Sequence, residues 1–173
     1  EKDVSAEAIK KSNMIFLEGY LWDEGDAKKA FDKAINNAKK VAMSLSDKFC
    51  VDRHKVNFLE LVKNKLDITF ANEDEISSLI NATDFNEVIS FGKEIKKHLI
   101  ITRGEKGALS IKDNKITEIG INKNLNIVDL TGAGDLFASG YLHGHLNNFS
   151  EEDCLKKGTE MSSKIIQQIG ARL

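Results

Sequence analysis

Short apolar runs alternate with amphipathic stretches along the first part of the chain. The apolar runs have the length and the branched or aromatic content of buried strands, and they occupy residues 14–17, 41–45, 67–71 and 98–102. Between them, apolar residues recur at the spacing of one helical face, which predicts helices over residues 27–38, 56–66 and 85–95. Asp26 and Asp84 stand where helix N-caps are expected. This alternation predicts an α/β fold in which a mostly parallel, layered sheet is flanked by helices.

The pattern changes in the second part of the chain. Asp113-Asn114 separates two short strand-like segments and predicts a two-residue hairpin turn. A further strand is predicted at residues 125–128, and helices at residues 135–147 and 151–168. No internal repeat, low-complexity tract or linker interrupts the sequence, so we expect residues 1–173 to form a single domain.

Composition narrows the class of protein. The chain has 173 residues, 25 basic and 27 acidic side chains, a formal net charge of −2 and 41% hydrophobic residues. These values suit a globular domain with a sizeable core and do not fit a disordered chain. Without a basic excess we expect no nucleic-acid partner, and no apolar stretch approaches the ~20 residues that a membrane span needs. Cys50 and Cys154 lie far apart without CxxC company, which favours free thiols and a cytoplasmic location.

The segment Asp129-Leu-Thr-Gly-Ala-Gly-Asp135 carries the most chemical information. It lies where a predicted strand ends and a long helix begins, so free backbone N–H groups and two glycines would form an anion site, most simply for a phosphate. A carboxylate at Asp135 repels such an anion. It is tolerated where it takes a proton from a hydroxyl that attacks the phosphate. The alternative is that Asp135 only caps the helix and that the glycines relieve a tight turn.

Two familiar phosphate motifs are excluded by the residues. The dinucleotide fingerprint needs a third glycine three positions after Gly134, and that position is Phe137. A P-loop needs a Gly-Lys-Ser/Thr triplet that closes a glycine-rich turn, and no such triplet follows a predicted strand. Neither a Rossmann dehydrogenase nor a Walker-type NTPase is supported.

The stretch DLTGAGDLFASGYL resembles the C-terminal signature of the ribokinase-like (PfkB) carbohydrate and nucleoside kinases, D-T-x-G-A-G-D followed by a helix that starts with small residues. Two more motifs stand in the family's order: NEDE at residues 72–75 resembles N-x-x-E, and TRGEKG at residues 102–107 resembles T-x-G-x-x-G. Taken alone, the first is more often a solvated helix start and the second a strand-ending turn. Together they imply a ribokinase-like α/β fold and the activity of an ATP-dependent kinase.

The resemblance implies catalytic roles for the GAGD segment. Asp135 would be the base that deprotonates the acceptor hydroxyl. The backbone of Gly132, Ala133 and Gly134 would form the anion hole that stabilises charge on the transferred γ-phosphoryl group of ATP.

The remaining matches concern the nucleotide and its cations. The turn that packs along ATP would be formed by Thr102, Gly104 and Gly107. Asn72 and Glu75 would organise Mg²⁺ through water, since this cation keeps much of its hydration. Asp129, with the backbone of Thr131, would help to hold a monovalent cation such as K⁺ behind the anion hole.

The family's acceptor-binding elements, an early aspartate, a Gly-Gly-Asn-type turn and a β-sheet lid, have no counterpart in this sequence. We therefore expect the chain to be the C-terminal nucleotide-binding and catalytic portion of a larger kinase, which as a full-length protein would form a homodimer. The segments SLSDKF and FANEDE resemble adenosine-kinase-like members, so adenosine is the first expected acceptor and a sugar such as ribose or fructose the second. Two alternatives stay open: a nucleotide-binding module without activity as a fragment, and a vitamin kinase of the same fold.

Overall fold

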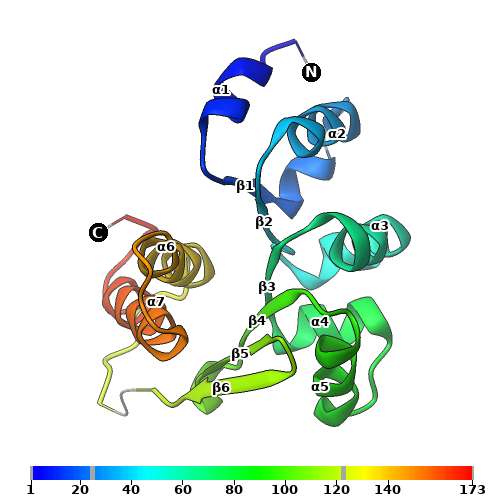
Figure 1. The fold of residues 1–173 in the computed structure, drawn as a ribbon. Helices are drawn as coiled ribbons and strands as arrows, with labels where there is room; N and C mark the ends of the chain where they lie inside the picture. The colour runs from blue at the N-terminus through cyan, green and yellow to red at the C-terminus, as the bar shows by residue number, and fades with distance from the viewer. Residues whose placement is uncertain (1, 24–25, 122–123, 173) are drawn as a thin grey trace. The chain divides into compact units, whose positions relative to one another are not determined.

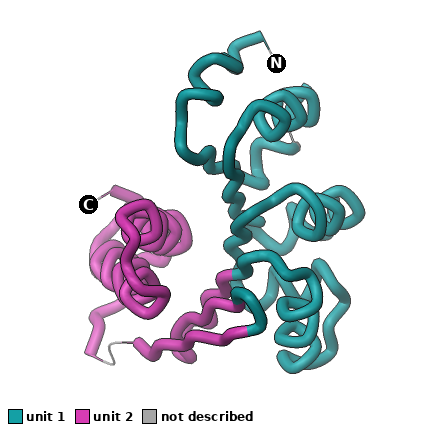
Figure 2. The backbone as a smooth tube through the Cα atoms, viewed as in Figure 1, with its two compact units in different colours: residues 1–99, 112–114 teal, residues 100–111, 115–173 magenta. Residues whose placement is uncertain are grey.

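The computed structural model describes residues 2–23, 26–121 and 124–172 (Figure 1). The chain divides into two compact units, which Figure 2 shows in different colours. Unit 1 comprises residues 1–99 and 112–114, and unit 2 comprises residues 100–111 and 115–173. Each unit is described below by itself.

The strands follow one another in the sheet in the order in which they occur in the sequence. The described strands are β1 (Ile15–Glu18), β2 (Val41–Ser44), β3 (Ile68–Asn72), β4 (His98–Thr102), β5 (Ala108–Lys112) and β6 (Lys115–Ile119). The pairs β1–β2 and β2–β3 are parallel, with Ile15 opposite Val41 and Ala42 opposite Ile68. The predicted α/β class with a mostly parallel sheet is confirmed.

The helices of unit 1 precede its first strand or connect successive strands. They are α1 (Ala6–Lys11), η1 (Gly19–Asp23), α2 (Ala27–Asn37), α3 (Lys48–Glu60), the π-helical turn η2 (Leu61–Lys65), α4 (Glu73–Ile80) and α5 (Phe85–Glu94). Right-handed crossovers between strands in sequential order place the connecting helices on the same face of a sheet. In Figure 1, α2 to α5 accordingly lie on one side of the unit 1 strands.

Helix α3 begins earlier than the predicted helix at residues 56–66. It starts at Lys48, because the side chain of Asp47 accepts a hydrogen bond of 2.5 Å from the N–H of Cys50 and caps the helix. The hydrophobic periodicity does not mark this start, because the large apolar residue Phe49 is exposed while its neighbours Cys50 and Val51 are buried. The boundary at residue 56 is therefore wrong.

Unit 2 contains the β5–β6 hairpin except for residues 112–114, which include its turn, and the two long C-terminal helices, α6 (Ala133–Leu146) and α7 (Glu151–Ile165). Asp113 and Asn114, which join β5 to β6, both have positive φ (50° and 62°), as a type I′ hairpin turn requires. The predicted hairpin is thus confirmed. Helices α6 and α7 approach closely at Gly140 and Gly158, where a Cβ atom would stand 2.6 Å from the oxygen of Lys157 and 2.8 Å from the oxygen of Phe137, respectively.

The strand predicted at residues 125–128 is absent. The N–H groups of Val128 and Asp129 both donate to the carbonyl oxygen of Ile166, at 2.8 and 3.3 Å, so this segment is bonded to the end of α7 and not to a strand. The hydrophobic side chains of Ile127 and Val128 are exposed.

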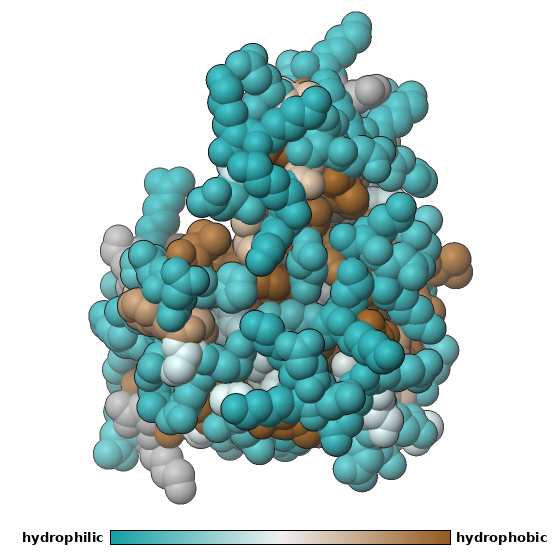
Figure 3. Space-filling model, viewed as in Figure 1, coloured by the Kyte–Doolittle hydropathy of each residue, from teal (hydrophilic) through white to brown (hydrophobic). Residues whose placement is uncertain are grey.

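Each unit has buried hydrophobic side chains of its own. The largest fully buried ones in unit 1 are Met43, Leu45, Phe58, Leu66, Ile76, Leu79 and Leu99. Those in unit 2 are Ile100, Ile101, Leu109, Ile111 and Tyr141. On the face drawn in Figure 3, hydrophilic residues predominate and hydrophobic residues show in several separate places. Within the described part of the chain, no helix has the length and apolar character needed to cross a membrane.

Candidate active site

The GAGD segment forms the beginning of helix α6 in unit 2. Gly132 is the N-cap residue and has a left-handed conformation, with φ of 79°. The N–H of Ala133 donates to the oxygen of Leu130 at 3.1 Å, so it is engaged within the turn. Helix geometry leaves the next N–H groups, those of Gly134 and Asp135, without an acceptor inside the helix. They are the donors of this turn that a bound anion would meet.

The two glycines of this segment serve different purposes. A Cβ atom on Gly132 would stand 2.9 Å from the Cβ of Ala171 and would require an unfavourable positive φ, so Gly132 is needed for the turn itself. A Cβ atom on Gly134 would meet no atom within 4 Å, and Gly134 is exposed. The space above Gly134 is therefore open to a ligand.

Asp135 lies in the first turn of α6, and its side chain is exposed. A negative charge is favourable at this position, because the N-terminus of a helix carries a partial positive charge. The same turn thus presents backbone donors and an accessible carboxylate side by side. A group that binds an anion and a group that can accept a proton are contiguous in the chain.

The TRGEKG motif forms a tight turn after β4. The N–H of Arg103 donates to the oxygen of Gly107 at 2.8 Å, and the N–H of Gly107 donates to the oxygen of Gly104 at 3.0 Å. Both glycines have positive φ, 55° at Gly104 and 89° at Gly107. A Cβ atom on Gly107 would stand 2.0 Å from the carbonyl oxygen of Ile119, so the turn packs directly against the end of β6.

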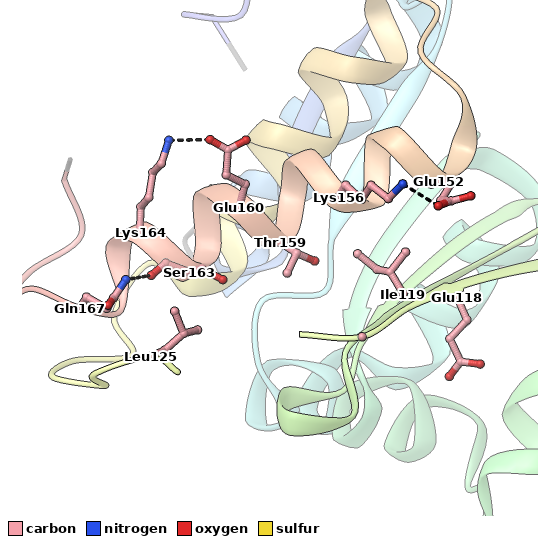
Figure 4. Close-up of a pocket in the computed structure, with 11 residues that line it drawn as sticks. Glu118, Ile119, Leu125, Glu152, Lys156, Thr159, Glu160, Ser163, Lys164 and Gln167 are labelled. Atoms are coloured by element: carbon pink, nitrogen blue, oxygen red, sulfur yellow. Dashed lines mark hydrogen bonds and ion pairs between the residues drawn. The ribbon is translucent and has the colours of Figure 1, made fainter. Parts of the chain in front are cut away.

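A cavity of about 690 Å³ adjoins this end of β6 (Figure 4). Its walls come from the end of β6, from the loop that follows, and from one face of α7; they comprise Glu118, Ile119, Gly120, Leu125, Glu152, Lys156, Thr159, Glu160, Ser163, Lys164 and Gln167. Figure 4 shows Lys164 paired with Glu160 and Lys156 paired with Glu152 along α7, at 2.6 Å each. The volume lies in the range of small-molecule sites.

Sequence reasoning missed this cavity. The polar residues Thr159 and Ser163 on α7 and Gln167 just after it recur every four positions, but such a row looks like an ordinary solvated helix face. The opposing residues Ile119 and Leu125 lie far away in the sequence, so the chain alone gave no sign that they meet α7.

Asn72 and Glu75 lie in unit 1, where β3 ends and α4 begins. They form a reciprocal capping box, in which Asn72 Oδ1 accepts from the N–H of Glu75 at 2.8 Å and Glu75 Oε2 accepts from the N–H of Asn72 at 2.9 Å. Asn72 Nδ2 also donates to Glu75 Oε1 at 2.6 Å. Burial, against the opposing effect of the backbone hydrogen bond from Asn72 and with a smaller contribution from the negative charges of Asp47 and Asp74, raises the pKa of Glu75 to about 7.

The fit of this pair to Mg²⁺ depends on the oxygens that remain. Each carboxylate oxygen of Glu75 accepts one hydrogen bond and retains a second lone pair, and Asn72 is exposed. Across the described ranges, no group of three or more His, Cys, Asp or Glu side chains is arranged to hold a metal ion. The pair therefore suits a hydrated Mg²⁺ better than a cation that is enclosed by protein ligands.

Asp129 and Thr131 are in direct contact in unit 2. Asp129 Oδ1 accepts from the N–H and from the hydroxyl of Thr131, at 2.9 and 2.7 Å, and Oδ2 accepts from the N–H of Gly170 at 2.9 Å. These hydrogen bonds lower the pKa of the Asp129 carboxyl group. The expected monovalent cation would share the carboxylate with these three donors.

Comparisons with known proteins agree with this architecture. The chain is 36% identical to an adenosine kinase from Sinorhizobium meliloti, whose crystal structure superposes with a TM-score of 0.95 over 99% of this chain and 54% of that one. It is 38% identical to a probable sugar kinase from Rhizobium etli, with a TM-score of 0.91 over 99% of this chain and 53% of that one. A cytidine kinase from Thermococcus kodakarensis is 33% identical over 118 residues, which cover 66% of this chain and 42% of that protein.

The chain thus spans about half the length of these relatives, or less. The similarity to the two crystal structures confirms the ribokinase-like α/β fold. The sequence model of the pfkB family carbohydrate kinases matches residues 1–173. The chain belongs to the pfkB family of carbohydrate kinases.

Proposed function

We propose that this chain carries the nucleotide-binding and catalytic functions of an ATP-dependent kinase, which transfers the γ-phosphoryl group of ATP to a hydroxyl group of a nucleoside or sugar. The observation that carries the proposal is the first turn of α6, where the open backbone at Gly134 adjoins the exposed carboxylate of Asp135. Family membership supports the reaction class.

In this proposal the first turn of α6 supplies both kinds of catalytic group. Asp135 accepts the proton of the acceptor hydroxyl as that oxygen attacks phosphorus. The N–H groups at the start of the helix stabilise the negative charge on the transferred group, and they need no reorganisation because the turn is already formed. Bound Mg²⁺ would neutralise phosphate charge, and Asn72 and Glu75 would orient its water ligands.

The cavity beside β6 is the proposed place of the nucleotide base. The turn at residues 102–107 packs on Ile119, and Ile119 in turn lines the cavity. A nucleotide lying along the turn could therefore extend into the cavity without leaving unit 2. Ile119 and Leu125 offer apolar surface to the base, and Thr159 and Ser163 offer hydrogen-bonding groups.

The proposed acceptor is adenosine first, and then a sugar such as ribose or fructose. Adenosine is supported by the 36% identity to the Sinorhizobium meliloti adenosine kinase, although the 38% identity to a probable sugar kinase supports the second choice similarly. An acceptor panel of adenosine, cytidine, ribose, fructose, 2-keto-3-deoxygluconate and pyridoxal, assayed with the full-length protein, separates these substrates. Phosphorylation of pyridoxal alone would contradict the nucleoside or sugar assignment.

The mechanism is tested by replacing the proposed base. Asp135→Asn in the full-length protein is expected to lower kcat by about 10²- to 10⁴-fold while ATP binding, measured by calorimetry, stays nearly unchanged. Asp153→Asn is the matched control, because Asp153 is likewise an exposed carboxylate in the first turn of a helix of unit 2 and lies outside the cavity. An Asp135→Asn variant with the activity of this control would contradict the assignment.

A further inference from the structure

The loop that precedes α6 is attached to the C-terminal segment of the chain. The carbonyl oxygen of Ile166, just after α7, accepts hydrogen bonds from the N–H groups of Val128 and Asp129. Four residues later, the N–H of Gly170 donates to the carboxylate of Asp129. Residues 128–132 and 166–171 therefore lie side by side within unit 2.

Asp129 is the side chain that links these two segments. One carboxylate oxygen accepts both donors of Thr131, and the other accepts the N–H of Gly170, 41 residues further along the chain. Thr131 is the residue immediately before Gly132, the cap of α6. A single carboxylate thus fixes the turn that leads into the GAGD segment and holds it against the C-terminal segment.

Helix α6 has no side-chain cap of its own. The N-caps of α3, α4, α5 and α7 are Asp47, Asn72, Asp84 and Ser150, and each holds its helix through its own side chain. The N-cap of α6 is Gly132, which has no side chain to do this. Gly132 instead lies against Ala171, so its contacts and those of Asp129 converge on the C-terminal segment.

We propose that Asp129 is a positioning residue, which ties the loop before α6 to residues 166–171 and thereby holds the first turn of α6 in the geometry needed for phosphoryl transfer. The inference rests on the proposed function of that turn. It assigns the carboxylate a hydrogen-bonding task, and it makes the C-terminal segment a structural part of the anion hole. A displacement of donors by about 1 Å can cost on the order of 100-fold in rate.

The first test separates positioning from general stability. Asp129→Asn retains one acceptor oxygen for Thr131 and loses the acceptor for Gly170. With ATP, Mg²⁺ and the first panel acceptor that is phosphorylated, kcat of the full-length variant should fall about 10- to 100-fold. The KM for ATP should change less than about 3-fold, because the cavity and the turn at residues 102–107 are untouched.

The control is Asp84→Asn, which changes an aspartate that also accepts two backbone N–H groups but does so at the start of α5 in unit 1. It should lower Tm about as much as Asp129→Asn while leaving kcat unchanged. Equal kcat in both variants would overturn the positioning role.

The second test needs no turnover. Amide hydrogen exchange in the protein without substrates should become about 10-fold faster or more at Gly170 in Asp129→Asn, and should stay unchanged at this amide in Asp84→Asn. Unchanged exchange in both variants would refute the tie itself. If Asp135→Asn were active, the proposed function would fail, whereas the exchange result would still decide whether Asp129 makes the tie.

A potassium titration examines the competing explanation. If Asp129 acts by hydrogen bonding, raising K⁺ from 1 to about 200 mM, at constant ionic strength, should not restore kcat of Asp129→Asn. Recovery of kcat to within about 2-fold of the parent protein would show that the carboxylate acts by holding a cation, and would overturn the inference.

Discussion

Glu75 and Asn72 hold each other at the end of β3 through three hydrogen bonds, two of which end on the carboxylate of Glu75. The side chain of Glu75 is 4% exposed, and the loss of hydration raises its pKa to about 7. This residue therefore changes charge close to physiological pH, while it caps helix α4 and belongs to the proposed Mg²⁺ site.

The raised pKa of Glu75 predicts a stability that falls as pH rises. In the unfolded chain the carboxyl group has a pKa near 4.5, so between pH 4.5 and 7 the folded state binds more protons than the unfolded state. The contribution of Glu75 is complete below pH 4.5 and is lost as pH rises through 7, by about 3 kcal/mol in total. Urea unfolding between pH 5 and 8 measures it. Glu75→Gln should flatten this dependence, and an unchanged slope in that variant would contradict the prediction.

Gly107 is predicted to tolerate no side chain. Gly107→Ala brings a Cβ atom against the carbonyl oxygen of Ile119 and demands a positive φ from an L-residue. The free energy of unfolding should fall by about 2 kcal/mol or more. Gly120→Ala is the control, because a Cβ atom there meets nothing within 4 Å, and it should change stability by less than about 0.5 kcal/mol. Similar denaturation midpoints for both variants would refute the close packing of the turn.

Gly140 is predicted to reverse the usual effect of alanine in a helix. Replacing an interior helical glycine by alanine ordinarily stabilises by about 1 kcal/mol. In α6 the new methyl group would stand 2.6 Å from the oxygen of Lys157 on α7, so Gly140→Ala should destabilise by about 1–3 kcal/mol. Chemical denaturation measures whether the free energy of unfolding of the Gly140→Ala variant falls or rises. Ser139→Ala, at the exposed neighbouring position, should be neutral or slightly stabilising, and a stabilising Gly140→Ala would contradict the contact.

Tyr141 is predicted to contribute through its hydroxyl group as well as its ring. The side chain is fully buried and its hydroxyl donates to Glu151 in the first turn of α7. Burial and this carboxylate raise the pKa of Tyr141 far above its ordinary value, so the phenol stays protonated. Tyr141→Phe should lower stability by about 1–2 kcal/mol, because a buried bond to a charged group is lost. Unfolding free energies identical within about 0.3 kcal/mol would show that the bond is energetically irrelevant.

Features decided by local chemistry could be predicted from the sequence. Asp84 caps α5 as expected, accepting from the N–H groups of Asn86 and Glu87. Asp26 precedes α2 as expected, but its carboxylate pairs with Lys29 at 3.0 Å and makes no cap hydrogen bond. The position of a helix start could therefore be predicted from the residue type. The hydrogen-bond partner of the exposed Asp26 carboxylate could not, because Lys29 on the following turn competes with the backbone N–H groups.

Features decided by distant contacts could not be predicted. Residues 125–128 have the composition of a strand, but the carbonyl oxygen of Ile166 takes the N–H of Val128. The cavity beside β6 could not be predicted for the same reason, since its walls come from elements that are distant in the sequence. The GAGD, N-x-x-E and T-x-G-x-x-G positions could be named because motifs mark them. Their catalytic and binding roles stay predictions that the experiments above address.

The sequential order of the strands also has a consequence for biosynthesis. Ile15 pairs with Val41 and Ala42 pairs with Ile68, so each parallel pairing in unit 1 closes a loop of the same modest length. During synthesis the chain emerges from the ribosome N-terminus first. Strands β1 to β3 can therefore pair one after another as the chain emerges. The loop before α6 cannot, since its tie to Gly170 requires nearly the whole chain of unit 2 to have been made.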